Sequence, residues 1–312
     1  MTYLIKRLFA VIPVLAVVAV IVFLLLRLAP GDPAVIIAGD TASAQDIEHI
    51  RQTLGLDRPL LTQFLTWIAR VLQGDLGTSV FTGMPVAEMI RQRVEPTLWI
   101  SALTMGFAVA FAVPMGIVSA WKAGTWIDRT VSGLAVTAFS LPVFVIGYGL
   151  VYGFSTHLGW FPVQGFKSLS EGFGPFIRHL ALLVISGELI YMALLARMTR
   201  STMLEVLAED YIRTARAKGV SSQRLLLRHA LKNAAVPIVT TIGLGIAMLL
   251  SGVIVTESVF AIPGIGRLTV DSILRRDYPV IQGIVLVTAS AYVAINLVTD
   301  LLYGLFDPRI RY

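Results

Sequence analysis

The chain has 312 residues, of which 56% are hydrophobic and only 14% are charged, and its mean hydropathy is +0.79. A soluble domain carries about 25% charged residues, so this composition excludes an ordinary soluble domain and indicates a polytopic membrane protein. The net charge of +6 is better explained by membrane insertion, which selects Lys and Arg on the cytoplasmic side, than by nucleic acid. We therefore expect contact with membrane lipid and none with nucleic acid.

Apolar runs predict an all-α fold with six transmembrane helices. The runs cover residues 8–26, 96–121, 130–156, 180–196, 233–256 and 278–299. At about 1.5 Å rise per residue, about 20 residues cross a hydrocarbon core of about 30 Å. The run over 180–196 is shorter and contains Glu188, but Arg197 and Arg200 mark a cytoplasmic end for it.

The basic residues give the predicted helices an orientation. With the amino terminus inside, Lys and Arg gather on the inner connections, whereas the outer connections are slightly acidic. This distribution follows the positive-inside rule and places both termini of the multi-pass chain in the cytoplasm. Lys6 and Arg7 also resemble the start of a signal peptide, but no small-x-small site precedes the polar turn, so we expect an uncleaved anchor over residues 1–28.

The next segment, residues 29–95, mixes helix-like apolar spacing with breakers such as Pro33, Pro59 and Gly74. We expect short amphipathic helices on the outer face rather than an autonomous domain. We expect residues 96–312 to hold the other five membrane helices.

Motifs for catalysis by the chain itself are missing. No lysine follows a glycine, so the phosphate-binding GK[ST] motif is absent, and no HExxH pair or cysteine occurs. We therefore expect no catalytic residue, no metal site and no bound cofactor in this chain, which is not predicted to be an enzyme.

Polar residues near the membrane interior are candidates for a translocation path. A charged carboxylate at Glu188 costs a few kcal/mol unless it is paired or faces water, so it either lines the path or lies neutral at a helix seam. Glu257 ends the fifth predicted span and either lines the path or lies at the interface. Ser251 accompanies Gly243 and Gly245 in the same span, where small residues either permit close helix approach or line a conduit.

The most distinctive region is the basic loop over residues 201–236. Residues 201–218 lack Pro and Gly and predict a helix, and Gly219 suits the left-handed position after it. A second helical segment begins at a Ser cap and runs to Pro237. The loop is either a docking helix for a soluble partner or a solvated connector whose charges obey the positive-inside rule.

This loop resembles the cytoplasmic coupling loop of ABC-importer permeases of the dipeptide, oligopeptide, glutathione and nickel branch. The general family pattern places Glu-Ala-Ala ahead of a glycine. In this chain the equivalent triplet before Gly219 is Arg213, Thr214 and Ala215. This departure bears on which branch the chain resembles and not on its resemblance to the family. Further matches are PGDPA at 30–34, LGLDRPL at 54–60, GDLGTS at 74–79, LPVF at 141–144, FAIPGIGRL at 260–268, RRDYPVIQG at 275–283 and NLVTDLLYGLFDPRIRY at 296–312.

The resemblance implies a permease subunit of a bacterial cytoplasmic (inner) membrane that pairs with a second homologous permease, with residues 96–312 as its five-helix permease core. Two cytoplasmic ATPases would bind ATP and Mg²⁺ and drive the pair, and an external or periplasmic solute-binding protein would deliver small peptides; glutathione or a nickel chelate is the alternative cargo. The implied coupling residues are Glu209, Asp210, Tyr211, Arg213, Thr214, Ala215, Arg216, Ala217 and Gly219, with Asp210, Tyr211, Arg213 and Arg216 as polar contacts and Ala215 and Ala217 allowing close approach. A self-sufficient secondary transporter, with Glu188 as its ion-coupling residue, is a less favoured alternative.

Overall fold

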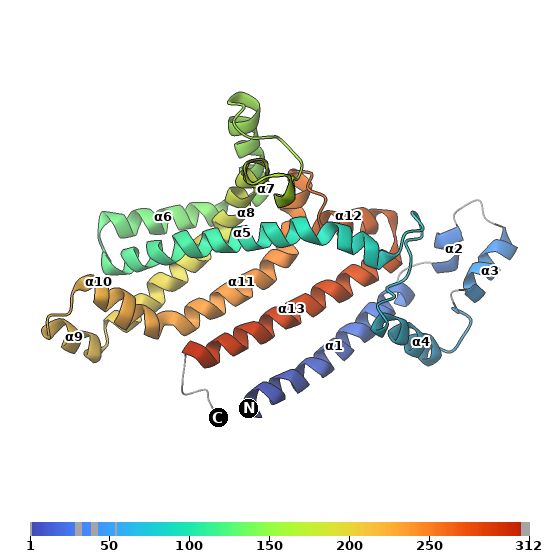
Figure 1. Cartoon of the computed structure of the whole chain (residues 1–312), viewed down its shortest axis with the longest axis horizontal. Helices are drawn as coiled ribbons and strands as arrows, with labels where there is room; N and C mark the ends of the chain where they lie inside the picture. The colour runs from blue at the N-terminus through green and yellow to red at the C-terminus, as the bar shows by residue number, and fades with distance from the viewer. Residues whose placement is uncertain (1, 29–32, 39–42, 54, 307–312) are drawn as a thin grey trace. The chain divides into compact units, whose positions relative to one another are not determined.

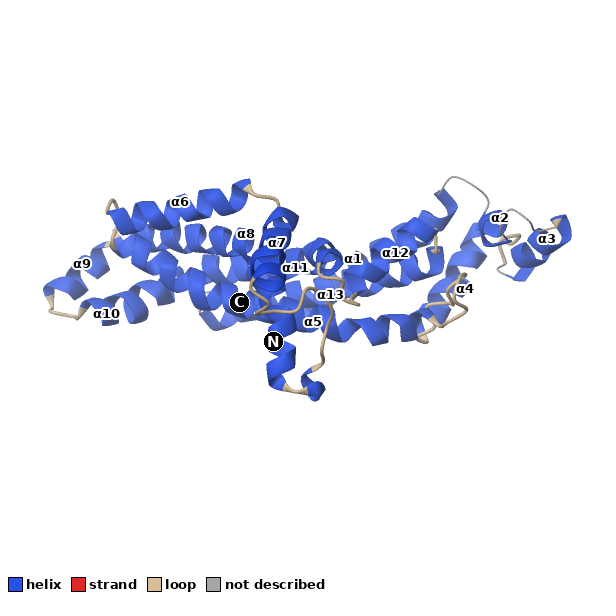
Figure 2. Cartoon of the chain, turned by 90° about the horizontal axis from the view of Figure 1, so that it is seen from above, coloured by secondary structure: helices blue, strands red, loops and turns tan. Residues whose placement is uncertain are grey.

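A computed structural model describes residues 2–28, 33–38, 43–53 and 55–306 (Figure 1). The side chains of some helical residues, Glu188 and Ser251 among them, lie outside this description. The described residues form helices and the loops between them, with one isolated β-bridge between Thr78 and Pro85, so the predicted all-α class is confirmed (Figure 2).

The elements are α1 (Thr2–Leu28), α2 (Pro33–Ala38), α3 (Ala44–Thr53), α4 (Leu60–Leu72), α5 (Val86–Trp121), α6 (Trp126–Ser140), α7 (Val143–Leu150), the π-helix η1 (Val151–His157), the 3₁₀-helix η2 (Leu169–Glu171), α8 (Phe173–Leu207), α9 (Asp210–Ala217), α10 (Ser222–Arg224), the π-helix η3 (Leu225–Ala230), α11 (Leu231–Val259), α12 (Ile265–Arg275) and α13 (Tyr278–Phe306).

The chain forms two compact units. The larger unit is built on residues Pro96–Arg267 with the end of α13, and the smaller one on Ile5–Glu95 with Leu268–Val293. In the smaller unit, Phe23 of α1 packs against Phe64 and Trp67 of α4, with ring centroids 5.2 and 5.8 Å apart. The amphipathic helix α4 therefore covers the end of α1 with its apolar face.

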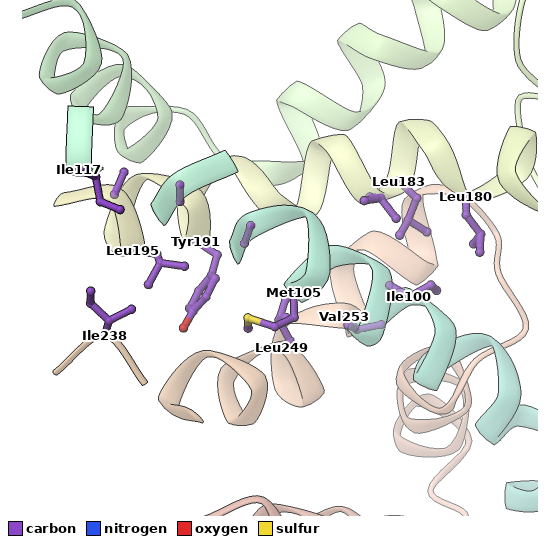
Figure 3. Close-up of a cluster of buried hydrophobic side chains, with 14 of the residues drawn as sticks. Ile100, Met105, Ile117, Leu180, Leu183, Tyr191, Leu195, Ile238, Leu249 and Val253 are labelled. Carbon is purple, nitrogen blue, oxygen red and sulfur yellow. The ribbon is translucent and has the colours of Figure 1, made fainter. Parts of the chain in front are cut away.

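The core of the larger unit lies where α8 packs against α11 and α5. Figure 3 shows its buried side chains, which come from all three helices: Ile100, Met105, Ile117, Leu180, Leu183, Tyr191, Leu195, Ile238, Leu249 and Val253. Glycines bring these helices close together. A Cβ atom at Gly245 would overlap the Tyr191 ring, and one at Gly243 would overlap the Thr299 side chain, so at these two positions the small residues permit close helix approach.

The predicted continuous helix over residues 130–156 is wrong, because α6 and the helix starting at Val143 meet at an angle of 100°. Pro142 has no N–H to donate and crowds the residue before it, and Leu141 accordingly adopts an extended backbone with φ −103° and ψ 127°. The proline in the LPVF motif therefore breaks the apolar run into two helices.

The length and composition of the described helices test only part of the predicted set of membrane spans. Among the described residues, the helices Val86–Trp121 and Tyr278–Leu301 are long and apolar enough to cross a membrane. The number rises to four if each of two bent pairs counts as one span, the second pair being Phe173–Gly187 with Leu189–Leu207. The count of six therefore stays a prediction.

Candidate functional site

The predicted docking helix is a separate element, α9, that follows a break in the chain. The expectation of one helix over residues 201–218 is wrong, because α8 ends at Leu207 and Glu209 takes an extended backbone with φ −67° and ψ 147°. No Gly or Pro marks this break in the sequence. The break turns α9 so that Ile212, whose exposed fraction is 1%, enters the core of the larger unit.

The end of α9 is as predicted. Gly219 has a φ of +77°, which is the left-handed conformation that suits glycine after a helix. Its N–H donates to the carbonyl oxygen of Arg216 at 3.0 Å, and the N–H of Val220 donates to that of Ala215 at 3.2 Å. These bonds satisfy the last carbonyl groups of the helix.

The second helical segment of the loop differs from the expectation in two respects. Ser221 occupies the N-cap of α10, but its side chain makes no capping hydrogen bond. The segment passes through the π-helix η3 into α11, and the helix continues past Pro237 to Val259. The loop therefore joins the membrane core through continuous helix rather than through a hinge at the proline.

The two faces of α9 differ in exposure. Ile212 is buried and Ala215 packs against the core, next to the buried Leu225 of η3. On the other side, the Asp210 and Arg213 side chains are 94% and 74% exposed and form an ion pair at 3.2 Å. The remaining exposed residues of α9 are Tyr211, Thr214, Arg216 and Ala217. Figures 1 and 2 show α9 beside α10 at one end of the larger unit.

The arrangement bears on the two alanines that were predicted to allow close approach to an ATPase. Ala215 is partly buried against the chain's own core, whereas Ala217 is exposed, and the roles of both in that contact stay predictions. The exposed polar face of α9 holds one carboxylate and two guanidinium groups, which suits a partner surface of mixed charge.

Tyr211 connects α9 to the beginning of α11. The Nδ2 of Asn233 donates to the Tyr211 hydroxyl at 2.9 Å and to the carbonyl oxygen of His229 at 2.8 Å. Desolvation raises the pKa of the Tyr211 phenol further above its ordinary value, which already keeps the group protonated at neutral pH. Sequence reasoning missed Asn233 because nothing in its neighbourhood distinguishes it from other polar residues of the loop.

A second link joins α9 to α5. The guanidinium of Arg216 lies over the ring of Trp121, the last residue of α5, at 5.3 Å from the ring centroid. A contact of this kind at an exposed site contributes about 0.5–1 kcal/mol. Arg216 was predicted as a contact to a partner, and the structure shows that it also contacts the permease itself.

A buried carboxylate next to this contact was also missed. Asp128 lies in the first turn of α6, and its side chain is 7% exposed. Its two carboxylate oxygens accept hydrogen bonds from Arg200 of α8 at 2.6 and 2.8 Å. They also accept bonds from the Ser119 hydroxyl at 2.6 Å and the Gly124 N–H at 2.9 Å.

Glu257 proves to be a structural residue in this conformation. It is fully buried, and its carboxylate accepts hydrogen bonds from the Thr97 hydroxyl at 2.6 Å and the Arg267 N–H at 3.0 Å. A Cβ atom at Gly264 would overlap the same carboxylate. In this conformation the side chain holds the turn after α11, and the role of Glu257 in a translocation path stays a prediction.

The other two predicted path residues cannot be placed in the same way. The side chains of Glu188 and Ser251 lie outside the described part of the structure. Among the described residues, no three His, Asp or Glu side chains are grouped to hold a metal ion.

Comparison with known proteins decides the family. Residues 112–312 match the family described as the inner membrane component of binding-protein-dependent transport systems, and residues 1–101 match the N-terminal region described for such membrane components. The chain belongs to this family. It is a permease subunit of an ABC importer, and is thus a transport component of the inner membrane rather than an enzyme.

Relatives of known annotation match nearly the full length of this permease. It is 50% identical over 310 residues to the probable peptide ABC transporter permease protein y4tP of Sinorhizobium fredii, with 99% of each chain covered. It is 47% identical over 312 residues to the glutathione transport system permease protein GsiC of Salmonella typhimurium and 46% identical to that of Escherichia coli, with 100% of this chain and 99% of those proteins covered.

Solved structures support the fold of the permease. Two inward-facing structures of the MetNI methionine ABC transporter match with TM-scores of 0.58 and 0.59 at 16% and 15% identity. Each match covers 70% of this chain and 96% of the other. Membership of the family implies ATPase and binding-protein partners.

Proposed function

We propose that this permease subunit imports small peptides and that α9 is the helix through which partner ATPases drive it. The observation that carries the proposal is the division of α9 into two faces. Ile212 and Ala215 fix one face to the permease, while Asp210, Arg213 and Ala217 are exposed on the other. A helix held in this way passes a push on its outer face to the helices beneath it.

The proposed topology has six membrane spans with both termini in the cytoplasm. The charge distribution supports it, because the basic loop with α9 then faces the cytoplasm. Residues 1–28 act as the anchor, residues 29–95 as an external helical segment, and residues 96–312 as the permease core. We keep Glu188 and Ser251 as proposed path residues.

The proposed assembly contains a second homologous permease, two cytoplasmic ATPases and an external solute-binding protein. The ATPases bind ATP and Mg²⁺, because this chain has no phosphate-binding GK[ST] motif of its own. The exposed coupling residues Glu209, Asp210, Arg213 and Thr214 contact the ATPase, with Ala217 allowing close approach. Tyr211, Arg216 and Gly219 hold α9 in position for that contact.

The proposed cargo is a small peptide, with glutathione as the second candidate. The peptide assignment follows the relative with 50% identity, and glutathione follows the relatives with 46% and 47% identity. Since glutathione is itself a tripeptide derivative, the two assignments describe similar chemistry. A nickel chelate is a third cargo within the same class of importer.

Reconstitution of the complete transporter tests the proposal. Proteoliposomes containing this chain, its partner permease and both ATPases should take up a labelled dipeptide or glutathione only with ATP and the solute-binding protein. Uptake by this chain alone, without ATPases, would show a secondary transporter and overturn the proposal.

A charge reversal on α9 tests the docking helix within the same preparation. Arg213→Glu should leave membrane insertion intact but abolish ATP-dependent uptake, because it places a second carboxylate beside Asp210 on the exposed face. The matched control is Arg275→Glu, an exposed residue of α12 on the predicted outer side, which should leave the binding of the ATPases unchanged. Unchanged uptake by Arg213→Glu would refute the docking role of α9.

A further inference from the structure

The turn between α5 and α6 is fastened to the end of α8 by a set of contacts that we call the clamp. It consists of Asp128, Arg200, Ser119 and the N–H of Gly124. The guanidinium of Arg200 binds both oxygens of the Asp128 carboxylate, and two parallel bonds of this kind fix the relative orientation of the groups as well as their distance. All four carboxylate bonds lie between 2.6 and 2.9 Å.

Burial makes the clamp stiffer than an ordinary surface ion pair. The Asp128 side chain is 7% exposed and that of Arg200 is 30% exposed. Exposed ion pairs are weak because water and salt compete for both charges, whereas a pair with a buried carboxylate that is satisfied by further donors holds one geometry. The ion pair of Arg213 with Asp210 on α9 is of the exposed kind.

The helices joined by the clamp also fit closely beneath it. A Cβ atom at Gly116 of α5 would lie 2.6 Å from the Cβ of Thr199 and 2.7 Å from the carbonyl oxygen of Ala196, both on α8. Such distances leave no room for any side chain larger than glycine's hydrogen at this crossing. The cytoplasmic ends of α5 and α8 are therefore held both by packing and by the clamp.

Both ends of α9 are connected to the region of the clamp. Arg200 lies near the end of α8, which leads through Ala208 and Glu209 directly into α9. From the other end of α9, Arg216 reaches Trp121 at the beginning of the turn that the clamp fastens. Both views in Figures 1 and 2 place the α5–α6 turn at the same end of the larger unit as α9.

We propose that the clamp is the joint through which displacement of α9 reaches α5 and α6. Asp128 and Arg200 are positioning residues: they touch neither ATPase nor cargo, and they make α9, the end of α8 and the α5–α6 turn move as one body. The inference rests on the proposed function, because it concerns how the push on α9 is passed on. A clamp with one charge removed lets α9 move without carrying α5 and α6 with it.

The number of cargo molecules imported per ATP measures this role. In complete proteoliposomes, Asp128→Asn should still bind the ATPases and hydrolyse ATP, while uptake per ATP should fall about tenfold, which corresponds to about 1.4 kcal/mol of coupling. Arg129→Gln is the matched control, because Arg129 is the exposed neighbour of Asp128 and lies outside the clamp. It should keep the wild-type ratio.

A double variant separates coupling from simple stability. Asp128→Asn combined with Arg200→Gln removes both charges and leaves no unpaired buried charge, so it should regain thermal stability relative to the single variant. We expect its uptake per ATP to stay low. If the ratio recovers together with the melting temperature, the clamp is only structural and the proposal is overturned.

A distance measurement tests the same idea in the unaltered clamp. Because the chain has no cysteine, Ala123→Cys and Lys218→Cys place one spin label on the α5–α6 turn and one after α9, with cysteine-free partner subunits. The mean distance between the two labels should be the same with and without ATP in the otherwise wild-type chain. In the Asp128→Asn background, the distribution of this distance should broaden when ATP is added. A distance that changes with ATP when the clamp is intact would refute the proposal.

The two proposals fail in different ways. If clamp variants keep the wild-type ratio while Arg213→Glu loses uptake, α9 remains the docking helix and only the clamp is refuted. If Arg213→Glu also keeps wild-type uptake, the proposed function of α9 fails.

Discussion

Asn233 donates a hydrogen bond to the hydroxyl of Tyr211 at 2.9 Å and thereby ties α9 to the beginning of α11. Tyr211 is itself 42% exposed, so the bond lies at the surface rather than in the core. It gives α9 a fixed direction relative to α11 in addition to the apolar attachment at Ile212.

Removing this hydroxyl should loosen α9. Tyr211→Phe loses a hydrogen bond worth about 0.5–1.5 kcal/mol, so we expect ATP-driven uptake to fall by about two- to tenfold with little change in membrane insertion. Uptake by proteoliposomes and capture of the ATPases measure the two effects. Asn233→Ala should give at least the same loss, because it also removes the bond to the His229 carbonyl, and the double variant should be no worse than Asn233→Ala alone. Additive losses would contradict a shared bond.

Gly219 should tolerate asparagine but not valine. Its φ of +77° strains a β-branched residue by about 1–2 kcal/mol, whereas asparagine enters this conformation more readily. A Cβ atom there meets nothing within 4 Å, so only the backbone conformation is tested. We expect Gly219→Val to lower uptake per ATP and Gly219→Asn to keep it. Equal activity of the two variants would show that the left-handed turn is not required.

Gly245 should not tolerate even alanine. The added Cβ would overlap the Tyr191 ring at the crossing of α8 and α11, and overpacking of this kind costs about 1–3 kcal/mol. We expect a lower melting temperature for Gly245→Ala in detergent. Gly106→Ala on α5 is the matched control, because a Cβ atom there meets nothing within 4 Å. Its melting temperature should be unchanged or higher, since alanine favours the helix.

Glu257→Gln should affect stability and not cargo selection. The amide of glutamine keeps one acceptor oxygen where the carboxylate has two, so one of the donors, Thr97 or the Arg267 N–H, loses its partner at a cost of about 1–3 kcal/mol. We expect a lower melting temperature with an unchanged preference between dipeptide and glutathione. A change in cargo preference without loss of stability would support the predicted role of Glu257 in the translocation path.

Local features of the loop were predictable from the sequence, whereas its attachments were not. The left-handed turn at Gly219 and the helical nature of α9 follow from residue types and their spacing. The pairs Asp128 with Arg200 and Tyr211 with Asn233 depend on how distant segments pack. The break between Leu207 and Asp210 is likewise unmarked by Gly or Pro, and it accompanies the burial of Ile212 in the core.

The membrane segments show the limit of hydropathy alone. The run over residues 130–156 is uncharged throughout, and its break follows from the backbone restrictions of Pro142 rather than from charge. Glu257 illustrates the reverse case. An acidic residue at the end of an apolar run suggested a path, but the Thr97 hydroxyl and a backbone N–H satisfy it inside the fold.

The burial of Ile212 has a consequence for the energetics of assembly. Because α9 is already folded against the permease, the loss of conformational entropy that orders it is incurred when this chain folds and not when an ATPase arrives. With the docking role that we propose for α9, the binding energy of an ATPase is therefore not reduced by the ordering of this helix.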